Sequence, residues 1–114
     1  MKIALVQKNL LVGGFDHNVK KILDGLFRAH ALGADLAVTS ELSTCGYPPH
    51  DLVEQEHFVA EGLGALAELV AKAPLPCVLG YIEPGDVPNR RYNTAALIAA
   101  GKVIATRRKS LLPT

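Results

Sequence analysis

Residues 33–41 read GADLAVTSE and carry three structural signals in a row. Gly33 is suited to end a preceding helix, because glycine adopts the left-handed conformation without steric cost. Residues 36–40 are short, apolar and partly β-branched, which predicts a buried strand. Glu41 follows that strand directly, at the edge of a sheet where open α/β folds bind their ligands.

The residues before this stretch predict another strand and a helix. Residues 2–7 (KIALVQ) form an apolar run typical of a buried strand, and a turn at residues 12–14 (VGG) follows. We expect Asp16 to cap the helix by accepting an amide hydrogen bond in its first turn. Two strands joined by such a helix are parallel, with a right-handed crossover. The helix is indicated by one stripe of side chains, namely Val19, Ile22, Leu23, Leu26 and His30.

The residues after it predict a loop, a helix and three strands. The loop, residues 41–51, contains two consecutive prolines, which exclude a helix or a central strand. A helix over residues 54–72 ends at Pro74 and Pro76, and a strand over residues 77–82 follows. We expect this helix to direct Phe58, Leu63, Leu66, Leu69 and Val70 inward.

Residues 91–99 and 102–108 indicate a hairpin that turns around Gly101. The predicted order is β-α-β-α-β-β-β, an α/β layer in which the helices cover one face. We expect the chain to be the front of something longer, because nothing in this order covers the edge of the hairpin.

Composition excludes several function classes. The 114 residues are 49% apolar and 20% charged, which is ordinary for one globular domain. A net charge of +1 gives no electrostatic footprint for nucleic acid or an anionic membrane. No apolar run approaches the ~18 residues that span a bilayer. The two cysteines lack CxxC spacing, so we expect a reducing cytoplasm.

Three polar residues are predicted at the carboxyl ends of strands, namely Gln7, Glu41 and Lys109. A Glu41 carboxylate partly desolvated by Leu42 and Tyr47 is suited to act as a general base. The Lys109 ammonium is suited to stabilise a developing oxyanion. Each residue also has an ordinary interpretation, as a solvated acid or a basic strand end.

Other chemistry-bearing residues receive structural interpretations. The glycines of residues 12–14 do not match G-x-G-x-x-G, and we interpret them as a turn. Cys45 is interpreted as a small, partly buried thiol, because a short loop is poorly suited to bring a residue four positions from Glu41 into attack geometry on a shared substrate. His30 lies on the apolar stripe and is interpreted as a core histidine. No metal-ligand spacing relates the four histidines, His17, His30, His50 and His57.

Several segments, taken in order, resemble the carbon–nitrogen hydrolase (nitrilase) superfamily. Among its members, the chain is similar to the amino-terminal glutaminase domains of glutamine-dependent NAD⁺ synthetases, and the similarity covers essentially all 114 residues. The G-Y-P-P-x-D-L pattern is the most specific part. The segments are residues 2–7 (KIALVQ), 33–38 (GADLAV), 40–42 (SEL), 45–52 (CGYPPHDL), 91–97 (RYNTAAL) and 108–114 (RKSLLPT).

The resemblance implies the front half of an α-β-β-α sandwich that carries a Glu–Lys–Cys amidase. It implies that Glu41 is the general base, that Lys109 stabilises the oxyanion, and that Tyr47 lines a glutamine pocket. It further implies that the ammonia released from L-glutamine passes to a synthetase domain. That domain uses ATP and Mg²⁺ to amidate nicotinic acid adenine dinucleotide to NAD⁺, whereas this segment needs no cofactor or metal.

The resemblance also implies that residues 1–114 form a partial hydrolase domain. The family nucleophile follows the lysine by some tens of residues, beyond Thr114, and neither Cys45 nor Cys77 matches it. We therefore expect the segment to be nearly inert alone and to work with the rest of its own chain, as a homo-oligomer. Two alternatives remain open, namely another nitrilase-superfamily amidase and a non-catalytic α/β interaction module.

Overall fold

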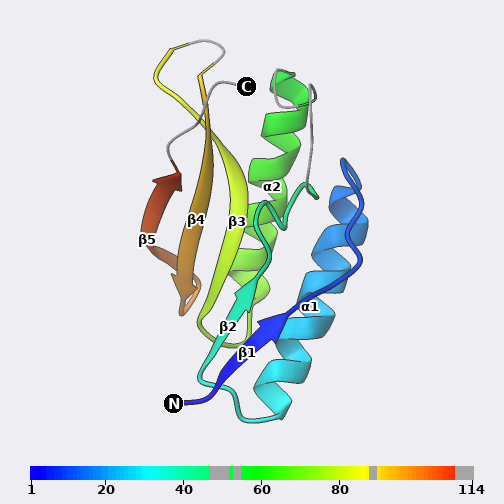
Figure 1. The fold of residues 1–114 in the computed structure, drawn as a ribbon, viewed down its shortest axis with the longest axis vertical. Coiled ribbons are helices and arrows are strands. Elements are labelled where there is room, and N and C mark those ends of the chain that lie inside the picture. Colours follow the sequence, from blue (N-terminus) through cyan, green and yellow to red (C-terminus); the bar gives the residue numbers. More distant parts are fainter. Residues whose placement is uncertain (47–51, 53–54, 88–89, 110–114) are drawn as a thin grey trace.

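The seven elements follow the chain in the predicted order (Figure 1). The computed structural model describes residues 1–46, 52, 55–87 and 90–109. Its strands begin and end within two residues of the predicted bounds, and it is a mixed α/β fold. The elements are β1 (Ile3–Val6), α1 (Phe15–Ala31), β2 (Leu36–Thr39), α2 (Glu56–Lys72), β3 (Cys77–Pro84), β4 (Arg91–Ala99) and β5 (Lys102–Lys109).

One five-stranded sheet holds the strands in the spatial order β1-β2-β3-β4-β5. The pair β1/β2 is parallel, as predicted, β2/β3 is parallel as well, and β3/β4 and β4/β5 are antiparallel. The turn between β4 and β5 uses Ala100 and Gly101, both at positive φ, which is the backbone of a tight hairpin. As a result, the carboxyl ends of β2, β3 and β5 and the amino end of β4 share one edge of the sheet.

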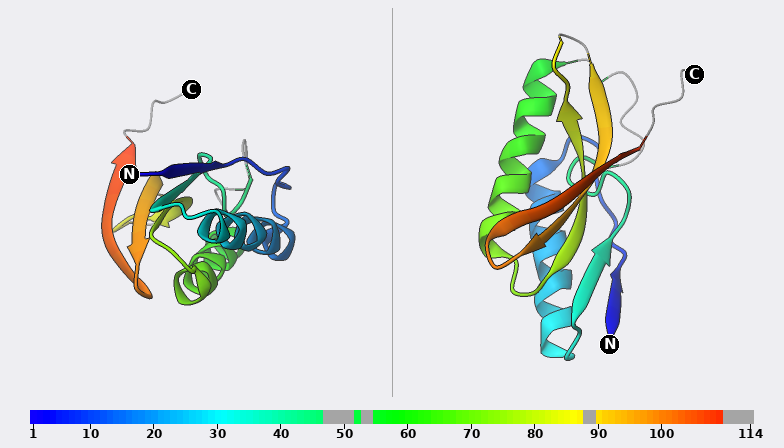
Figure 2. Two further views of the ribbon diagram at one scale, coloured as in Figure 1. Left: turned by 90° about the horizontal axis from the view of Figure 1, so that it is seen from below. Right: turned by 90° about the vertical axis from the view of Figure 1, so that its left-hand side faces the viewer.

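Both helices cover the same face of the sheet (Figure 2). Their buried side chains pack on alternate strand residues such as Ala37, Leu79 and Ala96, which are all 0% exposed. Residues that alternate with these point to the other face, which no described helix covers. On β1, Ile3 and Leu5 on that face are 52% and 73% exposed. We call this surface the open face.

The start of α1 differs from the prediction. Gly14 is the N-cap residue, and Asp16 lies inside the first turn without a capping hydrogen bond. Asn18 fixes the chain before the helix instead. Its buried side-chain amide accepts a hydrogen bond from the Leu11 amide and donates one to the Leu11 carbonyl, both at 2.8 Å. The same amide donates to the Thr44 carbonyl at 3.1 Å, which ties the β1–α1 loop to the loop after β2. A buried side chain that satisfies three backbone groups therefore replaces the predicted carboxylate cap.

Two predicted core positions are also wrong. His30 is exposed, and Ala29 occupies the buried position of that helical turn. Leu63 is 36% exposed, whereas its neighbour Gly62 is buried against the Phe15 ring. A Cβ added at Gly62 would stand 3.4 Å from Phe15 Cε1, so the two helices approach each other closely at this point. The left-handed Gly33 after α1 is confirmed, with φ of +83°.

Candidate active site

The loop after β2 is fixed to β3 by hydrogen bonds around Gly80. The Ser43 hydroxyl accepts from the Gly80 amide at 3.1 Å, and the Thr44 amide donates to the Gly80 carbonyl at 3.1 Å. Leu42 has a positive φ of 49° and is buried in the core. This anchoring sets where Glu41 stands, because Glu41 directly precedes the buried Leu42, two residues after the end of β2.

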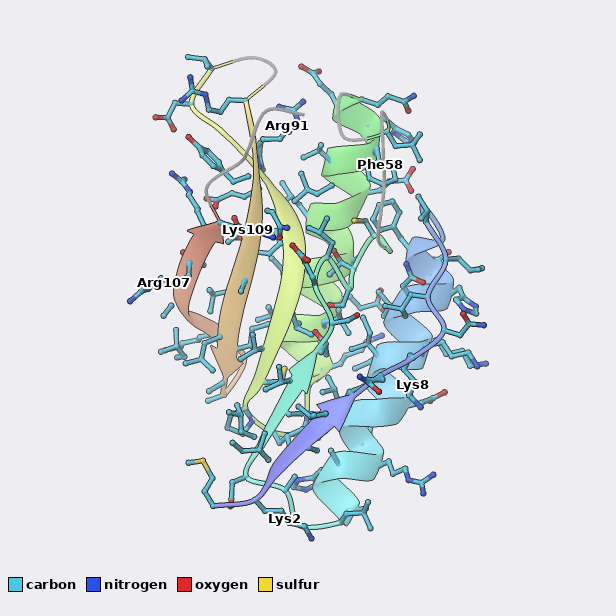
Figure 3. The ribbon with its side chains drawn as sticks, in the orientation of Figure 1. Lys2, Lys8, Phe58, Arg91, Arg107 and Lys109 are labelled. Atoms are coloured by element: carbon cyan, nitrogen blue, oxygen red, sulfur yellow. The ribbon has the colours of Figure 1, made fainter. Side chains whose placement is uncertain are left out.

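Glu41 and Lys109 meet at the shared edge of the sheet. Lys109 Nζ lies 3.2 Å from Glu41 Oε2, although the two residues are 68 positions apart in sequence. Both residues stand where the sequence predicts them, at the carboxyl ends of strands, and the fold brings these two ends together. The Glu41 side chain is 41% exposed and that of Lys109 is 65% exposed, so both groups are accessible from the open face. Figure 3 shows Lys109 directed toward the end of β2, whereas Arg107 points away.

Asn93 is the third member of the cluster. Its Nδ2 donates a hydrogen bond to Glu41 Oε2, the oxygen that Lys109 also contacts. Asn93 and Lys109 are direct partners in the β4/β5 register, so both side chains project from the same face. The predicted site did not include Asn93. The signal that could have found it was its place in the RYNTAAL segment, combined with a correct strand register.

A hollow of about 220 Å³ opens beside these three residues. Its size suits a small molecule, and its lining combines apolar residues such as Val78 and Leu79 with the charged pair. The lining includes Glu41, Leu42, Gly80, Asn93, Ala95 and Lys109. A carboxylate, an ammonium and an apolar wall together can bind a small neutral amide, stabilise negative charge on its carbonyl oxygen and transfer a proton to its nitrogen.

Cys45 lies outside this hollow. The side chain is 1% exposed, and its Sγ is within hydrogen-bonding distance of the Leu42 and Gly46 carbonyls. Burial raises the pKa of Cys45 to about 11, which keeps the thiol protonated near neutral pH. Cys77, in β3, is 0% exposed, and burial raises its pKa to about 11 as well. The predicted burial of the Cys45 thiol is confirmed.

A second ion pair lies on the helix-covered side of the same strands. Arg108 Nη2 is 2.9 Å from Glu83 Oε2, and its guanidinium stacks 4.2 Å from the Tyr92 ring centroid. The hydrogen bond from Arg108 holds the pKa of Glu83 below its usual range, and the Thr94 hydroxyl adds a further bond. This ion pair and its partners join β3, β4 and β5 on the face opposite the hollow. It therefore holds the ends of these three strands together and does not contact the hollow.

The other predicted site residues do not join the cluster. Gln7 lines a separate hollow beside α1, together with Lys8 and Arg28. Tyr47 lies outside the described residues, and so does the rest of the proline-containing stretch 47–51. Within the described ranges, no group of three His, Cys, Asp or Glu residues is arranged to hold a metal ion. No helix in the described part of the chain is both long and apolar enough to cross a bilayer.

Known proteins are similar to this chain in sequence and fold. Residues 2–114 match the carbon–nitrogen hydrolase family. A glutamine-dependent NAD⁺ synthetase of Synechocystis sp. is 37% identical over 98% of the chain. The structure of the corresponding Acinetobacter baumannii synthetase, in complex with ADP, superposes with a TM-score of 0.88 at 31% identity over 97% of the chain. The chain spans 21% of the length of each of these two relatives.

A shorter relative has the same architecture. An amidase from Nesterenkonia sp. superposes over 100% of the chain and 44% of its own length, with a TM-score of 0.84 at 30% identity. A glutamate-to-leucine variant of that amidase carries a covalent acetamide group from fluoroacetamide on its active-site cysteine. In that relative, therefore, the active-site cysteine is the residue that forms a covalent bond with the bound compound.

Proposed function

The chain belongs to the carbon–nitrogen hydrolase family, and we propose that it hydrolyses the side-chain amide of glutamine as part of a glutamine-dependent NAD⁺ synthetase. The observation that carries the proposal is the contact between Lys109 Nζ and Glu41 Oε2 beside a small hollow. The ammonia produced serves an ATP-dependent amidation of nicotinic acid adenine dinucleotide. The names of the similar synthetases and their coverage of nearly the whole segment support this choice.

The chemistry follows from the weakness of a carboxamide as an electrophile. A thiolate must attack the amide carbon, and the Lys109 ammonium stabilises the oxyanion that forms. Glu41 takes the thiol proton and returns it to the departing nitrogen, which leaves as ammonia. Glu41 then removes a proton from water as that water attacks the thioester, and glutamate is released with the thiol restored.

The proposal needs a nucleophile and a synthetase site from outside residues 1–114. Cys45 and Cys77 are buried and lie away from the hollow, so the reacting thiol comes from another segment of the protein. ATP and Mg²⁺ bind with that other part as well, and Tyr47 lines the glutamine pocket by resemblance. We further propose a cytoplasmic homo-oligomer, which the exposed apolar residues of the open face support.

A second candidate is a small-amide amidase without a synthetase partner. The observation that favours it is the equally complete superposition on the Nesterenkonia amidase. Both candidates use Glu41 and Lys109 in the same roles, so they differ only in substrate and in the fate of ammonia.

Ammonia release by the intact protein separates the two candidates. We expect turnover of glutamine at least about a hundredfold faster than that of propionamide, together with NAD⁺ formation that depends on ATP. Preference for propionamide, with no NAD⁺ formed, would identify a stand-alone amidase. Hydrolysis of neither amide would exclude both candidates.

A further inference from the structure

Two donors meet on one oxygen of Glu41. Asn93 Nδ2 and Lys109 Nζ both approach Oε2. The other oxygen, Oε1, accepts no hydrogen bond from the residues that the structure describes. The two carboxylate oxygens of the candidate base therefore differ. Oε2 accepts hydrogen bonds from side chains of β4 and β5, whereas Oε1 has no donor among the described residues.

The two donors differ in stiffness and charge. Asn93 is half-buried in β4, between β3 and β5, and only two side-chain torsions separate its amide from the backbone. Lys109 has four such torsions and a 65% exposed side chain. A short neutral amide fixes a carboxylate in place without cancelling its charge, whereas an exposed ammonium contributes charge with little constraint.

We infer that Asn93 is a positioning residue for the general base: its amide holds Oε2 of Glu41, so that Oε1 is the oxygen that exchanges protons with the nucleophile and the departing nitrogen. This inference rests on the proposed function of Glu41. It assigns separate tasks to the two oxygens, since the proton must leave and return at the oxygen that no donor occupies. It also assigns Lys109 to the oxyanion, with Asn93 carrying the task of orientation.

The charged groups near Glu41 influence the pH dependence of activity, which is the quantity that tests this inference. Lys109 and Arg107 of β5 line the same hollow, although the Arg107 side chain points away from the end of β2 (Figure 3), and Lys8 lies in a neighbouring hollow that Glu41 also lines. No titratable side chain of β3 or β4 lines either hollow among the described residues. Among the described residues, Asn93 is the only neutral side chain that donates a hydrogen bond to Glu41. Its substitution removes that donor and leaves the three nearby cations, Lys8, Arg107 and Lys109, in place.

The test measures kcat, KM and the pH profile of glutamine hydrolysis in the intact enzyme. Asn93→Ala removes the donor, and Asn93→Asp keeps the shape but adds a like charge. We expect kcat to fall roughly ten- to a hundredfold, with KM within about threefold. Because each change disfavours the charged form of the base, the acid limb of kcat/KM moves to higher pH, and it moves further for Asn93→Asp than for Asn93→Ala.

Glu83→Gln is the matched control, since Glu83 accepts hydrogen bonds on the opposite face of the same strands. It should lower the melting temperature without moving the acid limb. Folded Asn93 variants with an unmoved acid limb would overturn the inference, whether kcat stayed high or fell together with the melting temperature. Failure of the proposed function is distinguishable, because the unsubstituted enzyme would then release no ammonia from glutamine.

Discussion

At the scale of single residues, burial decides which thiol can react. A thiol attacks only as thiolate, and the buried Cys45 has a pKa raised to about 11. Its Sγ is held near the Leu42 and Gly46 carbonyls, inside the loop that carries Glu41. Although Cys45 is close to Glu41 in sequence, its buried side chain therefore packs inside the loop and does not reach the hollow.

Cys45→Ser in the intact enzyme tests this role. A serine hydroxyl can donate to the same carbonyls, so we expect glutamine turnover within a few-fold of the unsubstituted enzyme. The measurement is steady-state ammonia release. A fall of several orders of magnitude, the scale of losing a nucleophile, would show that Cys45 is the reacting thiol.

At the scale of elements, the site depends on how closely the loop after β2 approaches β3. A Cβ on Gly80 would lie 2.4 Å from the Leu42 amide nitrogen and 3.1 Å from its Cα. Both atoms are backbone, so the loop would have to move. Since Glu41 precedes Leu42, that movement displaces the carboxylate from Lys109.

Gly80→Ala should therefore reduce activity and stability together. We expect a fall in kcat of at least about tenfold and a destabilisation of about 1–3 kcal/mol, which is typical of overpacking. Gly64→Ala is the matched control, because a Cβ there meets nothing within 4 Å. That exposed helical position should gain about 0.5–1 kcal/mol, with unchanged turnover. Unchanged turnover in Gly80→Ala would mean that the loop does not position Glu41.

The elements also show what the sequence could predict. Apolar runs bounded by glycine and proline located all five strands, and the strand-end rule brought Glu41 and Lys109 together. Asn93 was missed because its face depends on strand register, and a one-residue slip would turn it to the helices. The prediction that Asp16 caps α1 was wrong. The start of the helix is fixed instead by Asn18, whose partners Leu11 and Thr44 come from two different loops.

At the scale of the whole molecule, the two faces of the sheet are unequal. The helices cover one face, while Ile3 and Leu5 lie exposed on the other at 52% and 73%. Contiguous apolar surface of this kind is uncommon on soluble monomers. The solved relatives are more than twice the length of the chain that superposes on them.

Residues 1–114 expressed alone should therefore be aggregated, loosely packed or oligomeric. Covering the open face removes its apolar side chains from water, which is favourable by about 25 cal/mol per Å². Size-exclusion chromatography and a denaturant melt are the measurements. A monomer of 12.1 kDa that unfolds cooperatively would contradict this expectation and favour the interaction-module alternative.

The central claim is that Glu41 and Lys109 form one catalytic unit, and kcat for ammonia release from glutamine tests it most directly. In the intact enzyme, Glu41→Gln and Lys109→Met should each lower kcat at least about a thousandfold. The double variant should be little worse than either, because members of one catalytic unit are not additive. Lys102→Met, at the far end of β5, should stay within about twofold. Retention of more than about a tenth of the turnover by a folded Glu41→Gln or Lys109→Met variant would contradict the account.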